Sequence, residues 1–198
     1  MTPFEFLANR RSSPQLTEPA PSRHEIYEMI RCAMRASDHG LLRPWRFLII
    51  ENDARARLGD LFVRAHLAGS TNTPEEYLDK LRMAPLRAPT MVAVIAKLVN
   101  HPKVPELEQL LSAGGAAQIL LLAAQAKGYG GIWRTGAPAY DHTVTEGLGL
   151  SEHERLVAFL YLGTPGKRPE IPEPQADEHI LHWIDVHQTS PVSAEVFR

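Results

Sequence analysis

The chain has 198 residues, with 21 Lys and Arg against 23 Asp and Glu and a formal net charge of −2. This length supports one sizeable core, and no shift in composition divides it, so we expect a single domain over residues 1–198. The charges are interspersed and create no field of one sign, which disfavours nucleic acid and anionic membranes as partners and favours small molecules.

Cys32 is the only cysteine, so the chain can form neither an internal disulfide nor a cysteine-based metal site. A lone thiol fits a reducing compartment, and we expect a cytoplasmic protein. The N-terminus lacks a basic region followed by an apolar run, and we expect no segment to approach the ~20 apolar residues that a membrane span needs. Cys32 falls within an apolar helical pattern and is expected to be buried.

Three helix starts are predicted from a Ser or Thr followed three residues later by Glu: Thr2 with Glu5, Ser22 with Glu25, and Thr73 with Glu76. The helix after Ser22 should present Arg35 and His39 at or just beyond its C-terminal end. The segment from Leu107 to Lys127 is predicted to be the longest helix. Its apolar residues nearly encircle it, as in a core helix or one buried against another subunit.

Four strands are predicted, the last of them short: Phe47–Ile50, Thr90–Ile95, Leu156–Leu162 and Gly131–Trp133. Two of these runs are apolar throughout, which indicates a central sheet covered on both faces in an α+β or three-layer arrangement. From about residue 164 the chain is rich in proline and is predicted to form an extended arm, of a kind that often wraps a partner subunit. The prolines are Pro165, Pro169, Pro172 and Pro174.

Arg10, Arg11 and Ser12 follow the first predicted helix. Two cations at this position compensate the negative end of a helix dipole, which is one interpretation. Guanidinium groups and a hydroxyl also match the oxygens of a phosphate, which makes the segment a candidate anion site. The residues alone leave both interpretations open.

A second group of cationic and aromatic residues lies between the predicted helix and the strand that follows it. Arg35, His39 and Trp45 belong to this short connection. Cations of this kind stabilise a heterocycle that becomes anionic on reduction, as a flavin does. A single histidine in such a loop is more commonly structural, and that alternative stays open.

The stretch from Gly128 to Gly136 places several glycines beside Trp133, Arg134 and Thr135. Gly128 is the expected cap of the preceding helix. The further glycines leave room for a ligand to approach the backbone, and the three larger side chains suit a flat, polar-edged, negatively charged molecule. The glycines follow a helix instead of opening one, so this is no dinucleotide fingerprint. We interpret the stretch as part of a flavin site.

Three histidines in the tail have a spacing that permits metal ligation: His179, His182 and His187. No cysteine is available to join them, and the composition of the tail predicts exposure. We therefore expect no metal site.

Four segments, taken in order, resemble the nitroreductase family of FMN-dependent oxidoreductases, and most closely its small single-domain bacterial branch. The likeness runs from about residue 4 to 164 and rests on 9–12, 34–39 with 44–47, 130–136 and 160–165. The resemblance implies a three-layer α+β fold with a central, mostly antiparallel sheet flanked by helices. It also implies an intertwined homodimer that binds FMN at the subunit interface.

The resemblance also implies roles for eight residues. Arg10, Arg11 and Ser12 would hold the phosphate and ribityl end of FMN, and Arg35 and His39 match a second cofactor-contacting segment. Trp133, Arg134 and Thr135 match a third segment, which lies along the isoalloxazine ring and reaches its edge partly through backbone groups. Both chains of the dimer would contribute.

The activity implied is hydride transfer from NADH or NADPH to the flavin, followed by reduction of a nitroaromatic, a quinone or a similar small acceptor in the same place by a ping-pong mechanism. The chain lacks the long inserted helices of larger relatives, so an open substrate pocket is expected. Two other hypotheses remain: a non-catalytic flavin carrier or sensor, and a phosphate-binding module that uses only Arg10 and Arg11.

Overall fold

The structure, a computed structural model, describes residues 1–70, 72–167, 170, 174–185 and 188–191. Two compact units are distinguished, Met1–Arg168 and Pro169–Arg198. The second contains a short helical turn, η3 (Ala176–Glu178), and an antiparallel pair of strands, β6 (Leu181–Asp185) and β7 (Gln188–Pro191), which the expectation of an extended arm did not anticipate. Pro169 and Pro172 lie outside the described residues, and a single domain with an arm stays a prediction.

The first unit is built on one antiparallel sheet. Its long strand β5 (Glu154–Pro165) pairs with β3 (Thr90–Lys97), with β4 (Gly130–Arg134) and with the two-residue β1 (Leu16–Thr17). Strand β3 also pairs with β2 (Trp45–Glu51). All four predicted strands are therefore confirmed, and so is the antiparallel sheet.

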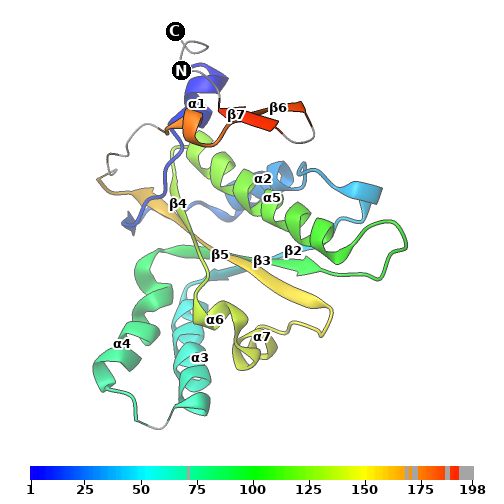
Figure 1. Cartoon of the computed structure of the whole chain (residues 1–198). Coiled ribbons are helices and arrows are strands. Elements are labelled where there is room, and N and C mark those ends of the chain that lie inside the picture. Colours follow the sequence, from blue (N-terminus) through cyan, green and yellow to red (C-terminus); the bar gives the residue numbers. More distant parts are fainter. Residues whose placement is uncertain (71, 168–169, 171–173, 186–187, 192–198) are drawn as a thin grey trace. The chain divides into compact units, whose positions relative to one another are not determined.

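Helices cover both faces of this sheet (Figure 1). On one side lie α2 (Arg23–Ala33) and α5 (Glu106–Ala126), and on the other α3 (Asp53–Gly69), α4 (Glu75–Met83), α6 (Ala137–Tyr140) and α7 (His142–Gly147). Each side has its own apolar cluster, and β3 contributes to both because its residues from Thr90 to Ala96 are all buried. The short elements α1 (Pro3–Ala8), η1 (His39–Leu41) and η2 (Ala84–Arg87) complete the unit. The predicted three-layer α+β class is confirmed.

Two of the three predicted helix starts are confirmed. Thr2 and Ser22 each accept a hydrogen bond from the backbone N–H of the glutamate three residues later, and that glutamate bonds back to the cap residue. The third is wrong, since α4 begins at Glu75 with Pro74 as its cap. The Thr73 hydroxyl instead lies 2.8 Å from Nε2 of His66, which ties it to the end of α3.

Helix α5 has nearly the predicted bounds, and it corrects another expectation. By length and composition alone, this helix is long and apolar enough to cross a membrane. The expectation that no segment has the length and apolar composition of a membrane span was therefore wrong. Four of its alanines, Ala113, Ala116, Ala117 and Ala124, are fully buried in the cluster that includes α2 and the sheet. One side of α5 therefore packs as a core helix does, whereas Leu107 and Leu111 are exposed.

Cys32 is exposed, contrary to expectation. The buried stripe of α2 consists of Ile26, Met29 and Ala33. Cys32 precedes Ala33, and successive helical residues are rotated by about 100°, so its side chain leaves the stripe.

Candidate functional site

The first and third predicted segments lie against each other within one chain. Helix α1 ends at Ala8, and the chain then runs alongside β4, where the N–H of Ser13 donates to the carbonyl oxygen of Gly131 at 3.0 Å. Arg10 and Arg11 line a small hollow there together with Ser13, Leu121, Gln125, Tyr129, Gly130 and Gly131. The fold therefore brings two cationic side chains to the start of the glycine-rich strand.

The two arginines differ in their surroundings. Arg11 donates from Nε to the carbonyl oxygen of Asn9 at 3.4 Å and from Nη2 to Oδ1 of Asn9 at 3.5 Å. It thus serves the end of α1, as one of the two interpretations predicted. Arg10 is half-buried, and its side chain makes no hydrogen bond that the described part of the chain provides. Arg10 is the better placed of the two to bind an anion. Ser12 is exposed.

The glycines of β4 serve the packing of the chain itself. A Cβ atom on Gly130 would lie 2.7 Å from Oγ of Ser13, and one on Gly131 would lie 2.6 Å from Cδ2 of Leu121. At these two positions, close packing within the chain therefore replaces the interpretation that the glycines make room for a ligand. Gly128 has φ of 86° just after the end of α5, as expected for a cap, and Gly136 has φ of 74°.

Trp133 and Arg134 point to opposite faces of the sheet, as neighbours in a strand do. The Trp133 ring packs toward α5, where a Cβ on Gly114 would lie 3.9 Å away. The Arg134 guanidinium lies on the other face, 5.7 Å from the centroid of the Tyr161 ring. Because Trp133 and Arg134 lie on opposite faces of the sheet, a single ligand can contact both residues only at the edge of β4.

That edge is open. Within the described residues, β5 is the only strand paired with β4. The carbonyl of Gly131 points away from β5 toward Ser13, and because backbone groups alternate along an antiparallel strand, the N–H and C=O of Trp133 point to the same open side. A flat molecule with hydrogen-bonding groups along its rim matches such an edge.

One side-chain atom of Arg134 also lacks a hydrogen-bond partner within the described residues. Its Nε is buried and has no hydrogen-bond acceptor among the residues that the structure describes. A buried donor without an acceptor is costly, by about 1–3 kcal/mol. An acceptor supplied by a ligand would remove this cost.

The second predicted segment lies elsewhere on the chain. Arg35 follows α2 and is exposed, and His39 begins η1, both beyond the end of the helix as predicted. Nδ1 of His39 lies 2.6 Å from Oε2 of Glu108 on α5. The Asp38 carboxylate fixes the loop by accepting the backbone N–H groups of Leu42 and Arg43.

His39 lines a shallow, largely apolar hollow over α5, together with Ala36, Ser37, Glu108, Leu111, Ser112, Gly115, Gln118 and Ile119. Three hollows of the described chain contain some of the eight predicted residues, and each of the three contains only one or two of them. They divide into three surface regions, and their assembly from two chains stays a prediction.

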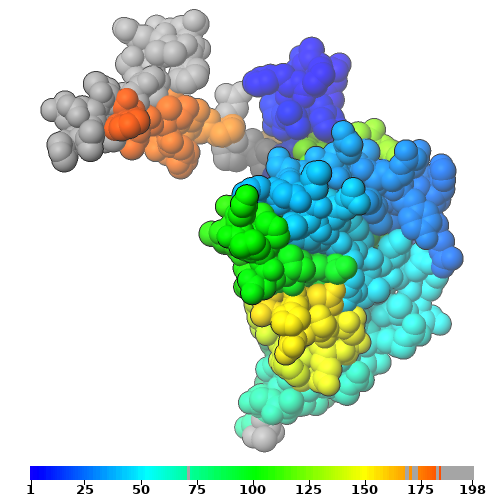
Figure 2. Space-filling view, turned by 90° about the vertical axis from the view of Figure 1, so that its right-hand side faces the viewer, coloured from blue at the N-terminus to red at the C-terminus, as the bar shows by residue number. Residues whose placement is uncertain are grey.

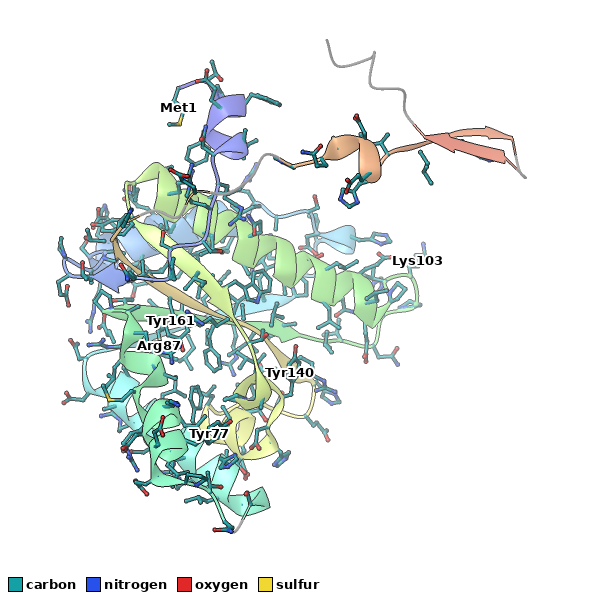
Figure 3. All side chains as sticks on the ribbon, turned by 60° about the vertical axis from the view of Figure 1, so that its left-hand side comes forward. Met1, Tyr77, Arg87, Lys103, Tyr140 and Tyr161 are labelled. Atoms are coloured by element: carbon teal, nitrogen blue, oxygen red, sulfur yellow. The ribbon has the colours of Figure 1, made fainter. Side chains whose placement is uncertain are left out.

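Sequence reasoning missed the surroundings of Arg134 and Thr135. These residues line a hollow with Lys80 of α4, Arg87 of η2 and Tyr161 of β5. Figure 3 shows Arg87 and Tyr161 close together. Burial raises the pKa of the Tyr161 phenol, while the charges of Arg134 and Arg87 act in the opposite direction. No local motif marks these residues, because the pairing of β4 with β5 brings them together.

A cavity of about 890 Å³ contains none of the eight predicted residues. It lies where the start of α5 meets α6, α7 and the first residues of β5, and the green and yellow segments of Figure 2 adjoin there. Glu154 lines it and accepts from Nε of Arg46 at 2.6 Å, which lowers the pKa of the Glu154 carboxyl to about 2. We interpret this ion pair as a structural link between β5 and β2.

Of the three tail histidines, His187 lies outside the described residues, and only the backbone of His182 is described. Within the described ranges no cluster of three metal-ligating side chains is found. The absence of a metal site stays a prediction.

Known proteins are similar to this chain over most of its length. The family described as "Nitroreductase family" matches residues 7–164. The chain is 42% identical over 165 residues to the Escherichia coli protein named "Putative NAD(P)H nitroreductase YdjA", covering 83% of this chain and 89% of that protein.

Solved structures share the fold. One is a nitroreductase-like family protein from Bacillus cereus, with a TM-score of 0.77 at 22% identity, covering 91% of this chain and 95% of that one. Another is a variant of the FMN and NADPH-dependent nitroreductase NfnB from Sphigopyxis sp. strain HMH, with a TM-score of 0.72 at 20% identity, covering 93% of this chain and 100% of that one.

Proposed function

This chain belongs to the nitroreductase family, and from that premise we propose that it is an FMN-dependent enzyme that oxidises NADH or NADPH and reduces nitroaromatics, quinones or similar small acceptors. The relationship covers most of both chains, and one structural neighbour is described as dependent on FMN and NADPH. The proposed location is the cytoplasm.

The observation that carries this proposal is the placing of Arg10 beside the open edge of β4. The residues present fit FMN: a half-buried guanidinium at one end suits a phosphate, and an unpaired strand edge beyond it suits the polar rim of a ring. Bound FMN accepts a hydride from the nicotinamide and passes reducing equivalents to the acceptor. We assign Arg10, Arg11 and Ser12 to the phosphate and ribityl end, and the Trp133 to Thr135 segment to the ring.

We propose that Arg35 and His39 complete the site from a second copy of the chain. His39 and Leu111 line the apolar hollow over α5, and Arg35 directly precedes its lining residue Ala36. Leu107 and Leu111 of α5 each expose 65% of their surface. Apolar surface of this kind is buried in most soluble proteins, and a partner subunit would cover it. The assembly is a homodimer with its cofactor at the interface.

The side chains have a supporting role in this chemistry. Arg35 and Arg134 hold positive charge where negative charge develops during reduction, which lowers the free energy of the charged state. Neither a nucleophile nor a dedicated general acid is required of the chain. Since the sequence has no dinucleotide fingerprint, we propose that the nicotinamide and the acceptor occupy one place in turn.

The experiment is to purify the protein from flavin-replete cells and to identify the released chromophore. We expect about one FMN per chain. A colourless protein that takes up no FMN on titration would overturn the proposal and leave a phosphate-binding module as the better hypothesis. A yellow protein that neither NADH nor NADPH bleaches without oxygen would instead support the non-catalytic carrier or sensor.

A further inference from the structure

The hollow at the end of β4 has a composition that the proposed function does not explain. It measures about 470 Å³ and lies between α4 and η2 on one side and the end of β4 and the middle of β5 on the other. This volume is within the range of small-ligand pockets. The hollow lies on the α3 face of the sheet, next to Thr135 and Gly136.

Its floor is aromatic. Phe62 and Phe159 meet edge to face with their ring centroids 5.6 Å apart, and the Tyr161 ring lies beside them on β5. Aromatic surfaces of this kind pack against a planar ring placed over them.

Its rim is cationic, with Lys80, Arg87 and Arg134, and none of its lining residues is an Asp or Glu. Lys80 is paired with Glu76 at 2.7 Å, whereas neither Arg87 nor Arg134 has a carboxylate partner among the described residues. Two cations above an aromatic floor therefore lack a counter-charge.

Two polar groups at the hollow also lack hydrogen-bond partners. Nε of Arg134 is buried without an acceptor in the described chain. Tyr161, which lines the hollow, is only 3% exposed, and its hydroxyl makes no hydrogen bond to any residue of the described ranges. A nearly buried phenol and a buried guanidinium nitrogen are both donors, and an anionic group would satisfy them together.

We propose that this hollow binds an aromatic anion of the benzoate or phenolate type, with its charge held by Arg87, Arg134 and the Tyr161 hydroxyl and its ring over the aromatic floor. This rests on the proposed function and narrows it, because Arg134 and Thr135 also belong to the segment assigned to the flavin ring. A ligand in the hollow would lie beside this segment, so we expect the preferred acceptors to be negatively charged aromatics.

The test compares two probes that differ in charge, 4-nitrobenzoate and 4-nitrobenzamide, by titration calorimetry with the purified flavin-containing protein. We expect the acid to bind at least tenfold more tightly than the amide. Arg87→Gln should weaken binding of the acid by about 10-fold or more, the scale of a charge-assisted hydrogen bond, and leave the amide unchanged. Tyr161→Phe should also weaken binding of the acid, although it keeps the aromatic floor of the hollow.

Arg57→Gln is the matched control, since Arg57 is exposed on α3 and does not line the hollow. It should change neither affinity, and thermal melting checks that every variant is folded. Equal affinity for acid and amide, or an Arg87→Gln variant with unchanged affinity, would overturn the proposal. Arg87→Gln could instead weaken the binding of NADPH and leave the affinity for the acid unchanged. In that case the cations bind the phosphates of the dinucleotide, and the proposal of an aromatic anion is wrong.

Failure of the proposed function and failure of the ligand assignment give different results. Protein without FMN overturns the proposed function, and with it the identity of the anion as an acceptor. Protein that contains FMN and is reduced by NADPH, but does not distinguish acid from amide, overturns only the assignment of this hollow.

Discussion

Arg10 and Arg11 are adjacent in sequence but meet different surroundings. Arg11 already donates to Asn9 at the end of α1, whereas the Arg10 side chain reaches the hollow beside β4 without a hydrogen bond to the described residues. Removing the Arg10 guanidinium should therefore affect a bound phosphate more than it affects the fold.

We expect Arg10→Ala to weaken FMN binding by about 1.5–3 kcal/mol, the range for hydrogen bonds to charged groups. Fluorescence titration of flavin-free protein with FMN measures this. Arg11→Ala should cost less affinity, because part of its hydrogen bonding is to Asn9. An unchanged dissociation constant for Arg10→Ala would return the segment to a purely helix-capping role.

Gly131 tests whether the glycines of β4 serve packing. A Cβ there would lie 2.6 Å from Leu121 and 3.3 Å from the carbonyl oxygen of Tyr161. Gly131→Ala should therefore lower the free energy of unfolding by about 1–3 kcal/mol, the usual cost of overpacking. Urea denaturation measures it. Gly114→Ala on α5, where the nearest contact is an ordinary 3.9 Å, should be neutral or stabilising, and an equal loss in both variants would contradict this account.

At the scale of elements, the Arg46 and Glu154 pair joins β2 to β5. The pKa of Glu154 falls from 4.5 to about 2, first because of its hydrogen bond with Arg46. A carboxyl with a lowered pKa in the folded state stabilises the protein above pH 4.5, and this stabilisation is lost as the pH falls from 4.5 toward 2. Its magnitude at neutral pH is on the order of 3 kcal/mol.

Glu154→Gln should accordingly be less stable than the parent at pH 7, and the difference should shrink as the pH approaches 2. Unfolding free energies of both proteins at several pH values measure this. A difference that stays constant between pH 7 and pH 3 would exclude the carboxylate as its source.

Local patterns predicted the elements that local physics determines. The apolar runs of β3 and β5 are visible in the sequence because burial on both faces leaves almost no polar positions in them. Helix α5 is visible as a long, mostly apolar run between helix-ending signals. Thr73 does not cap α4, because its hydroxyl is in contact with His66, a contact that only the folded chain provides. The two-residue β1 is too short for any periodicity.

The site could be predicted only where its residues form short motifs. The segments at Arg10 and Trp133 were found in this way, and the fold does bring them together. Arg87 and Tyr161 were missed because they adjoin Arg134 only through the pairing of β4 with β5 and the packing of η2. Such contacts are determined by tertiary structure.

At the scale of the whole molecule, the proposed dimer can be tested through Leu111, which is exposed on α5. Leu111→Glu should shift the protein from dimer to monomer and lower its FMN content, because a charge would be buried in an apolar interface. Leu67→Glu, an exposed leucine of α3, is the control. Sedimentation velocity at micromolar concentration measures both, and a stable flavin-loaded monomer of the unaltered protein would contradict the assembly.

The central claim is that one flavin site serves two substrates in turn, and a pair of separated half-reactions tests it most directly. Protein is bleached by NADPH without oxygen, freed of nicotinamide by gel filtration, and then mixed with 4-nitrobenzoate or a quinone. We predict that bleaching needs no acceptor and that the acceptor alone restores the original absorbance of the oxidised flavin. Bleaching that occurs only when both substrates are present, or reduced protein that no acceptor reoxidises, would contradict the account.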